Sequence, residues 1–233
     1  MHFRRTLNLG IVVLVGLTAW AQSPSRPSTT RSSSGHSSSA PSQKPAAGID
    51  AGSVVNGVYR NKGLGLTYKL PAGWVLRTEE MNAPEGADSA STKTSESSPQ
   101  GARRGTGDSR VLLAAFSRPP EAKGEDVNGS VVIAAESVEA YPGLKEAEQY
   151  FGPLTEVATA QGFSADEDPY EVEVGTKKLV RGDFHKDVGT RVMRQSTLVW
   201  LAHGYAVSIT VIGGSEDEVE ELIDGINFES KGK

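Results

Sequence analysis

The sequence predicts one folded α/β domain in the C-terminal three-quarters of the 233-residue chain. Three observations predict it. Several segments alternate apolar and polar residues with a period of two, which is typical of strands with one buried face. Two others are apolar almost throughout, as expected for central strands covered on both faces. Two further segments repeat apolar residues at spacings of three and four, which favours amphipathic helices.

The domain opens with strands that alternate. We expect order to begin near Val54, with a short strand at 58–59 and a second strand at 64–70. In the second strand every other residue is large and apolar, namely Leu64, Leu66, Tyr68 and Leu70. Residues 71–73 (Pro-Ala-Gly) then turn the chain, and Trp74 needs a core in which to lie.

Residues 79–110 interrupt this pattern with Ser, Thr, Gly, Ala and charged side chains. We interpret them as a surface insertion, largely disordered, although unstructured loops of this length are uncommon in compact domains. A domain boundary is the alternative, and it is disfavoured because residues 55–76 are too few to hold a core. The apolar runs 111–116 and 130–135 then predict the central strands.

A helix is expected from Pro142, which suits a first turn, to Gly162, which suits a helix end. Gly152-Pro153 predicts a kink or a division into two short helices. A hairpin (170–174 with 177–185) and two long strands (190–201 and 205–212) follow. Ser215 and Glu218 then form a predicted capping box for a last helix. Its expected core residues are Val219, Leu222, Ile223, Ile226 and Phe228.

Residues 1–21 are interpreted as a signal peptide. Two arginines precede the apolar run 7–19, and Ala19 and Ala21 occupy the −3 and −1 positions of a cut before Gln22. An uncleaved anchor is the alternative, but the run is shorter than the roughly 20 residues that span a bilayer. No cysteine stands at the cut, which excludes a lipid anchor there. The expected location is therefore secreted or periplasmic, with no stable membrane span after cleavage.

Residues 22–53 form a Ser/Pro-rich tether that is expected to be disordered, and the domain is assigned to 54–230. The tether is either a spacer or a tail without a partner. Cleavage would remove two arginines and change the formal net charge from −5 to −7. This acidic balance disfavours nucleic acid as a partner. With no cysteine, neither disulfides nor thiol chemistry is available.

Three motifs carry a resemblance to a known family. They are Leu-Thr-Tyr-Lys-Leu-Pro-Ala-Gly-Trp (66–74), His-Gly-Tyr-Ala-Val-Ser-Ile (203–209) and Ile-Asn-Phe (226–228). With them, residues 55–230 resemble the PsbP-like family, which includes the photosystem II extrinsic protein and a yeast Ran-binding import factor. The resemblance implies an α+β fold, with a central, mainly antiparallel sheet flanked by helices as an α/β/α sandwich. It also implies a non-catalytic accessory or binding module, and no functional residue carries over.

The sequence holds no complete catalytic or phosphate-binding motif. Asp183, His185 and His203 are the candidate site residues, because Asp183 and His185 share a strand face and both histidines lie within the domain. A zinc site takes three or four ligands, so exposed polar groups are the favoured interpretation. The acidic loop 166–168, with Glu171 and Glu173, is a candidate for calcium, but it lacks the usual loop pattern, and a solvated acidic loop is the favoured interpretation. We predict no catalytic or metal-binding residue and no cofactor.

The sequence therefore favours an exported, non-catalytic accessory or binding protein of the cell envelope, acting through contacts with an unknown protein or envelope component. Two alternatives stay open. One is a small hydrolase-type enzyme that uses His185 or His203. The other is a carrier of a small apolar ligand held between a helix and the sheet.

Overall fold

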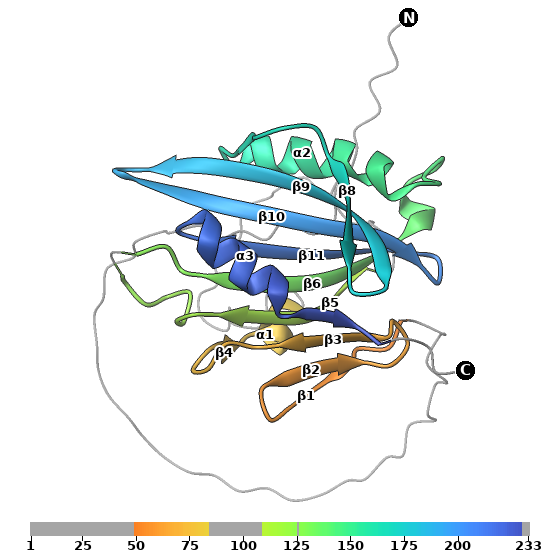
Figure 1. Cartoon of the computed structure of the whole chain (residues 1–233), viewed down its shortest axis with the longest axis horizontal. Coiled ribbons are helices and arrows are strands. Elements are labelled where there is room, and N and C mark those ends of the chain that lie inside the picture. The colour runs from red at the N-terminus through yellow and green to blue at the C-terminus, as the bar shows by residue number, and fades with distance from the viewer. Residues whose placement is uncertain (1–48, 84–108, 125, 230–233) are drawn as a thin grey trace, which may run out of the picture.

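The computed structural model describes residues 49–83, 109–124 and 126–229. The predicted signal peptide (1–21), its cleavage site at Ala19, Ala21 and Gln22, and the tether up to residue 48 lie outside these ranges. The described ranges form two antiparallel sheets with helices on both sides of the larger one (Figure 1). The α+β class with a mainly antiparallel sheet flanked by helices is therefore confirmed.

The larger sheet has eight strands in the order β4-β5-β6-β11-β10-β9-β7, and β8 pairs with β9 off this path. Its strands are β4 (Val75–Leu76), β5 (Ser109–Phe116), β6 (Ser130–Ser137), β7 (Ser164–Ala165), β8 (Tyr170–Val174), β9 (Lys177–Val188), β10 (Arg191–Ala202) and β11 (Tyr205–Gly213). Within the described residues, neighbouring strands of this sheet pair antiparallel. The sequence-based expectation of a hairpin followed by two long strands is confirmed.

The smaller sheet has the order β1-β2-β3-β12 and joins the two ends of the domain. Its strands are β1 (Ser53–Val55), β2 (Val58–Asn61), β3 (Leu66–Lys69) and β12 (Ile226–Phe228). Asn61 fixes the start of the domain to this sheet. Its side-chain amide donates to the carbonyl of Asp50 (2.6 Å) and accepts from the backbone N–H of Leu64 (3.0 Å).

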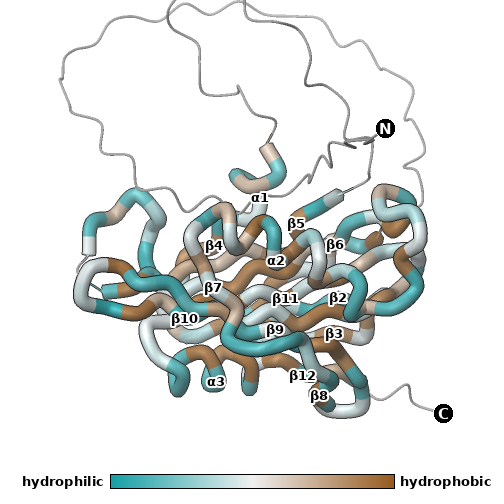
Figure 2. The backbone as a smooth tube through the Cα atoms, turned by 90° about the horizontal axis from the view of Figure 1, so that it is seen from above, coloured by the Kyte–Doolittle hydropathy of each residue, from teal (hydrophilic) through white to brown (hydrophobic). Residues whose placement is uncertain are grey.

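The larger sheet is covered on both faces. α3 (Glu216–Asp224) and the smaller sheet lie on one face, and α1 (Thr78–Met81) and α2 (Phe151–Ala160) lie on the other (Figure 2). Side chains on β10 alternate accordingly, because successive residues of a strand point to opposite faces. Leu198 and Trp200 face α3, whereas Val199 and Leu201 face α2.

The two apolar runs are central strands, as predicted. Every residue of β5 from Val111 onward and every residue of β6 is buried. The expected core residues after Ser215 are also buried. Ser215 Oγ accepts from the N–H of Glu218 (3.2 Å), but the Glu218 carboxylate accepts from Gly214 (2.6 Å) instead of the N-cap residue. Half of the predicted capping box is therefore present.

The helix expected from Pro142 begins later. Two short 3-10 helices, η1 (Val138–Ala140) and η2 (Ala147–Tyr150), precede α2. Pro142 lies in a turn with Gly143, whose φ of 100° is left-handed and ends any regular helix there. η2 leads directly into α2, so the helical geometry changes at residues 150–151. Gly152-Pro153 lies in the first turn of α2, where proline is tolerated, and does not divide the helix as predicted. Gly162 follows the helix with φ 87°, as expected of a residue after a helix end.

Regular structure extends into both ends of the predicted insertion at 79–110. α1 includes residues 79–81, and β5 begins at Ser109. Met81 explains why α1 is ordered, because its side chain packs against apolar side chains of β5 and β6. Residues 84–108 lie outside the described ranges. Among the residues that the structure describes, no helix is long and apolar enough to cross a membrane.

Candidate functional site

The first candidate site is a polar cluster between β9, β10 and α3. The Asp183 carboxylate accepts three hydrogen bonds, from Tyr170 Oη (2.8 Å), Arg181 Nε (2.9 Å) and Ser196 Oγ (2.6 Å). Arg181 also donates to Glu220 on α3 (2.5 Å). Register brings these groups together, because Ser196 is directly opposite Asp183 and Tyr170 is directly opposite Arg181.

The surroundings of Tyr170 and Arg181 raise the pKa values of both side chains. Burial and the hydrogen bond to Asp183 raise the pKa of Tyr170 to about 12. Burial alone would lower the pKa of Arg181, but hydrogen bonds to Glu220 and Asp183 outweigh it, so the net pKa is raised. The phenol therefore stays neutral and the guanidinium stays charged. With three donors on Asp183, this cluster is suited to joining α3 to the sheet rather than to moving a proton.

His185 extends the cluster toward solvent. Its Nδ1 is in hydrogen-bonding contact with the Asp166 carboxylate, and Arg194 approaches the other oxygen of that carboxylate at 3.9 Å. A polar cleft of about 190 Å³ adjoins these groups. Asp183 lies beside His185 on the strand, as predicted, but its hydrogen-bond partners are Tyr170, Arg181 and Ser196. The carboxylate that orients the imidazole is Asp166.

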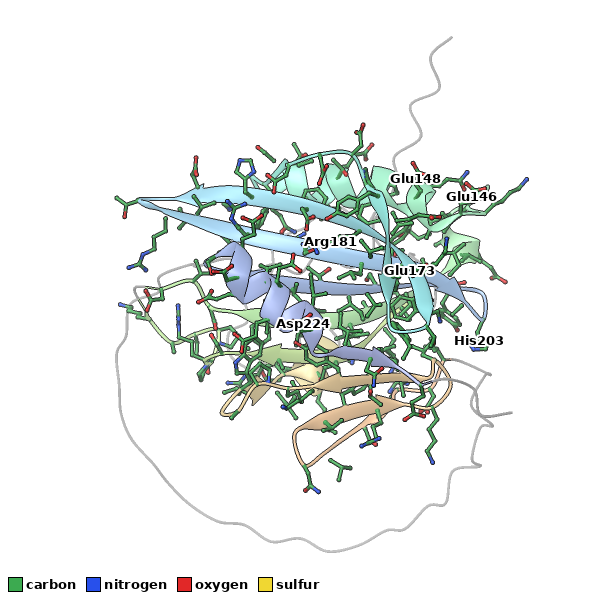
Figure 3. All side chains as sticks on the ribbon, in the orientation of Figure 1. Glu146, Glu148, Glu173, Arg181, His203 and Asp224 are labelled. Carbon is green, nitrogen blue, oxygen red and sulfur yellow. The ribbon has the colours of Figure 1, made fainter. Side chains whose placement is uncertain are left out.

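His203 is far from this cluster. It occupies the turn between β10 and β11, where it has φ 52° and its Nε2 lies 3.0 Å from the carbonyl oxygen of Gly63. His185 pairs with Arg194, nine residues before His203 on the same β10 hairpin. At about 3.3 Å per residue, this separates the histidines by about 30 Å. Figure 3 accordingly shows His203 at one end of the sheet and Arg181 near its middle. No single pocket can contain both imidazoles.

The acidic loop considered for calcium brings no ligand set together. Within residues 49–83, 109–124 and 126–229, no three His, Asp or Glu side chains are grouped so that they could hold a metal ion. Asp166 instead contacts His185, and Glu171 lies 3.6 Å from the ammonium of Lys178.

A second candidate site is a groove of about 670 Å³ between the two sheets. Residues 51–54, at and just before the start of β1, line one side with Tyr59 of β2, and the start of β5 (110–113) lines another. α1 and Leu76 line the remainder. Its volume is that of a typical ligand site. Its lining is mixed, because the charged side chains of Arg77, Glu79, Glu80 and Arg110 lie beside apolar ones. Leu76 is 45% exposed there, which is unusual for a large apolar side chain in the described part of the chain.

The β5 wall of this groove is closed by side chains from α1. The Asn82 amide donates to the carbonyl of Val111 (2.8 Å) and accepts from its N–H (3.0 Å), as a neighbouring strand would. Thr78 Oγ1 accepts from the N–H of Ala114 (2.9 Å). These contacts satisfy an edge strand that would otherwise invite pairing with another chain.

Sequence reasoning missed this groove because its walls come from segments about 60 residues apart. The sequence feature that could have indicated the groove is the pair Thr78 and Asn82, which are polar residues at helical spacing directly after a short strand. The sequence alone does not say that they would reach across to β5.

Comparison with known proteins gives weak matches of fold. No family model and no curated protein sequence matches the chain. Solved structures that match include the Saccharomyces cerevisiae Ran-binding protein Mog1p, with 10% identity, 70% of this chain and 90% of that chain covered, and a TM-score of 0.39. LpqN of Mycobacterium tuberculosis, described as involved in cell envelope biogenesis, matches with 10% identity, coverage of 71% and 83%, and a TM-score of 0.33.

A Pseudomonas aeruginosa protein of unknown function matches with 14% identity, coverage of 53% and 78%, and a TM-score of 0.31. No residue's role is transferred from these proteins.

Proposed function

We propose that this chain is an exported, non-catalytic accessory or binding protein of the cell envelope that acts through contacts with another protein. The observation that carries the binding role is the groove between the two sheets, which is lined by polar and apolar side chains and has the exposed side chain of Leu76 at its rim. The export part rests on the signal-peptide pattern of residues 1–21. The roles described for LpqN and Mog1p are compatible with the proposal and do not carry it.

Site-specific photo-crosslinking in the source cell tests both parts. A photoreactive amino acid is placed at Leu76 in the full chain, and the cell is fractionated after irradiation. We expect the mature chain, beginning at Gln22, in the extracytoplasmic fraction, cross-linked to one discrete protein. The matched control position is Val192, which is 37% exposed on β10, a strand separated from β5 by β6 and β11. Equal cross-linking from both positions, or retention of an uncleaved chain in the cytoplasm, would refute the proposal.

One observation favours the hydrolase alternative at a single position. Asp166 contacts Nδ1 of His185, which orients the imidazole and leaves Nε2 directed elsewhere, as in many general bases. If this pair is catalytic, the purified domain hydrolyses p-nitrophenyl butyrate, and His185→Gln removes at least about nine-tenths of that rate, since general-base catalysis contributes about 100-fold or more. His203→Gln is the matched control and should keep the full rate. No hydrolysis above buffer, or equal rates in both variants, would end this alternative.

A further inference from the structure

We infer that residues 77–82, which contain α1, form a displaceable strap over the outer edge of β5, and that release of this strap lets β5 pair with β5 of a second copy of the chain. β5 is in effect an edge strand, because its outer neighbour β4 has only two residues and pairs with Ala115 and Phe116. Figure 2 shows α1 at the margin of the domain beside β5. This device requires neither export nor the partner proposed above.

The strap occupies the backbone groups that a neighbouring strand would use. The Asn82 side chain bonds both the N–H and the C=O of Val111 (3.0 and 2.8 Å). Thr78 Oγ1 accepts from the N–H of Ala114 (2.9 Å), and the N–H of Arg77 donates to the C=O of the same residue (2.9 Å). The outward N–H and C=O groups of Val111 and Ala114 are therefore all satisfied while the strap is in place.

The strap itself is held by few buried contacts. α1 is a single turn, and all four of its residues are at least partly exposed. Helices this short depend on tertiary packing, which Met81 provides against apolar side chains of β5 and β6. Arg77 pairs with Glu80 and Glu121, but these acids are 66% and 72% exposed, and such surface pairs contribute little. Segments with few buried contacts open at a lower free energy than the rest of a domain.

Under the strap lies a strand suited to pairing with itself. Residues 111–116 (Val-Leu-Leu-Ala-Ala-Phe) contain no charge, proline or glycine, which is the composition of segments that pair between identical chains when their edge is exposed. Arg110 and a β-bulge between Val111 and Leu113 protect this edge in part. The strap protects the remainder. Two antiparallel copies of one edge are related by a two-fold axis, so the expected product is a closed dimer.

The other side of the larger sheet is protected by charge instead. β8 carries the exposed side chains Glu171 and Glu173. In a second copy placed against this strand, the same carboxylates would face them, and like charges directly opposite each other are destabilising. Self-pairing is therefore expected at β5 and not at β8.

Hydrogen exchange of the mature chain (22–233), followed residue by residue by NMR, tests whether the strap opens by itself. The N–H of Ala114 points to the strap, and the N–H of Ala115 points to β6, because outward and inward groups alternate along an antiparallel strand. We expect Ala114 to exchange at least about 100-fold faster than Ala115, since only the second is protected until the domain unfolds. Equal rates would show that α1 opens only with the whole domain and would overturn the inference.

Sedimentation equilibrium of Asn82→Ala tests the occupant. The variant loses both bonds to Val111, and we expect its dimer dissociation constant to be at least about tenfold lower than that of the wild-type chain, because the strap competes less for β5. Asn227→Ala, which removes an exposed asparagine from the edge strand β12, is the matched control and should sediment as the wild type does. In the Asn82→Ala dimer, the N–H groups of Val111 and Ala114 should be protected from exchange again. Unchanged association, or association that leaves these N–H groups unprotected, would contradict the inference.

Two further variants keep the test decisive if Asn82→Ala is poorly folded or associates at another surface. Thr78→Val removes the acceptor for Ala114 and should lower the dissociation constant by about threefold, the effect of one hydrogen bond. Val111→Pro, added to Asn82→Ala, removes the outward N–H, and proline is tolerated where the N–H faces away from the sheet. This double variant should return to the wild-type dissociation constant. A tight dimer that persists in it would place the contact elsewhere and refute pairing at β5.

Discussion

Replacing Asp183 by alanine is expected to lower the free energy of unfolding by about 3 kcal/mol, because breaking one side of a buried ion pair typically costs 3–5 kcal/mol. The side chains of Asp183 and Arg181 are 18% and 14% exposed. The substitution leaves the Arg181 guanidinium, Ser196 and Tyr170 without their common acceptor. Arg181 keeps its hydrogen bond to Glu220, which places the expected loss at the lower end of this range.

Urea or thermal unfolding monitored by circular dichroism measures this loss. A change of about 3 kcal/mol corresponds to a fall in Tm of about 6–12 °C in a domain of this size. Glu171→Ala is the matched control, because Glu171 and Lys178 form a pair whose side chains are 75% and 70% exposed. Such surface pairs contribute about 0–1 kcal/mol. A loss below 1 kcal/mol in Asp183→Ala would show that the cluster does not stabilise the domain.

Raising the pH above 10 is expected to unfold the domain steeply. Burial raises the pKa of Tyr59 to about 12 and also raises the pKa values of Tyr68 and Tyr150. These side chains are 1%, 0% and 3% exposed. The folded state therefore keeps their protons when the unfolded state, with pKa near 10, begins to lose them.

The direction follows from this difference in proton binding. Below pH 10 both states hold the three protons and the stability is complete. As the pH rises from 10 toward the folded pKa values, the unfolded state binds fewer protons and stability falls by up to about 1.4 kcal/mol per pH unit for each tyrosine. Three such groups together give about 4 kcal/mol per pH unit, which exhausts the 5–15 kcal/mol of a typical domain within a few pH units.

Parallel titrations of phenolate absorbance and circular dichroism check this expectation. The buried tyrosines should ionise together with the loss of ellipticity. Tyr68→Phe should lessen the steepness without loss of stability at pH 7, because Tyr68 Oη is buried and has no hydrogen-bond partner among the described residues. Smooth ionisation of all tyrosines near pH 10 before any unfolding would contradict the prediction.

Much of the fold was predictable from local pattern. The runs at 111–116 and 130–135 predicted fully buried strands because a strand covered on both faces has no polar alternation. The helix after Ser215 was predicted from its cap and its apolar spacing. The start of α2 was not, because Pro142 is equally suited to a first helical turn and to the tight turn that it forms with Gly143.

The candidate site was predictable only in part. Asp183 and His185 were singled out because they share a strand face, yet their partners come from elsewhere in the chain. Ser196 reaches Asp183 through the register of β9 and β10, and Glu220 reaches Arg181 because α3 crosses that face. Asp166, not Asp183, orients His185. Such contacts cannot be predicted from the sequence, because the spacing of residues along one strand does not specify which residues of the neighbouring strand lie opposite them.

The sequence by itself determined the class of the fold, the positions of its central strands and last helix, and the expectation of export, because these depend on hydrophobic period, caps and terminal composition. Only the tertiary structure decided that His185 and His203 lie at separate places and that Asp183 is fully engaged in hydrogen bonds. It alone brought residues 51–54 and the start of β5 together in one groove. The reason is that sites and grooves form from segments that are far apart in the sequence. Strand register and helix docking determine which of these segments are in contact.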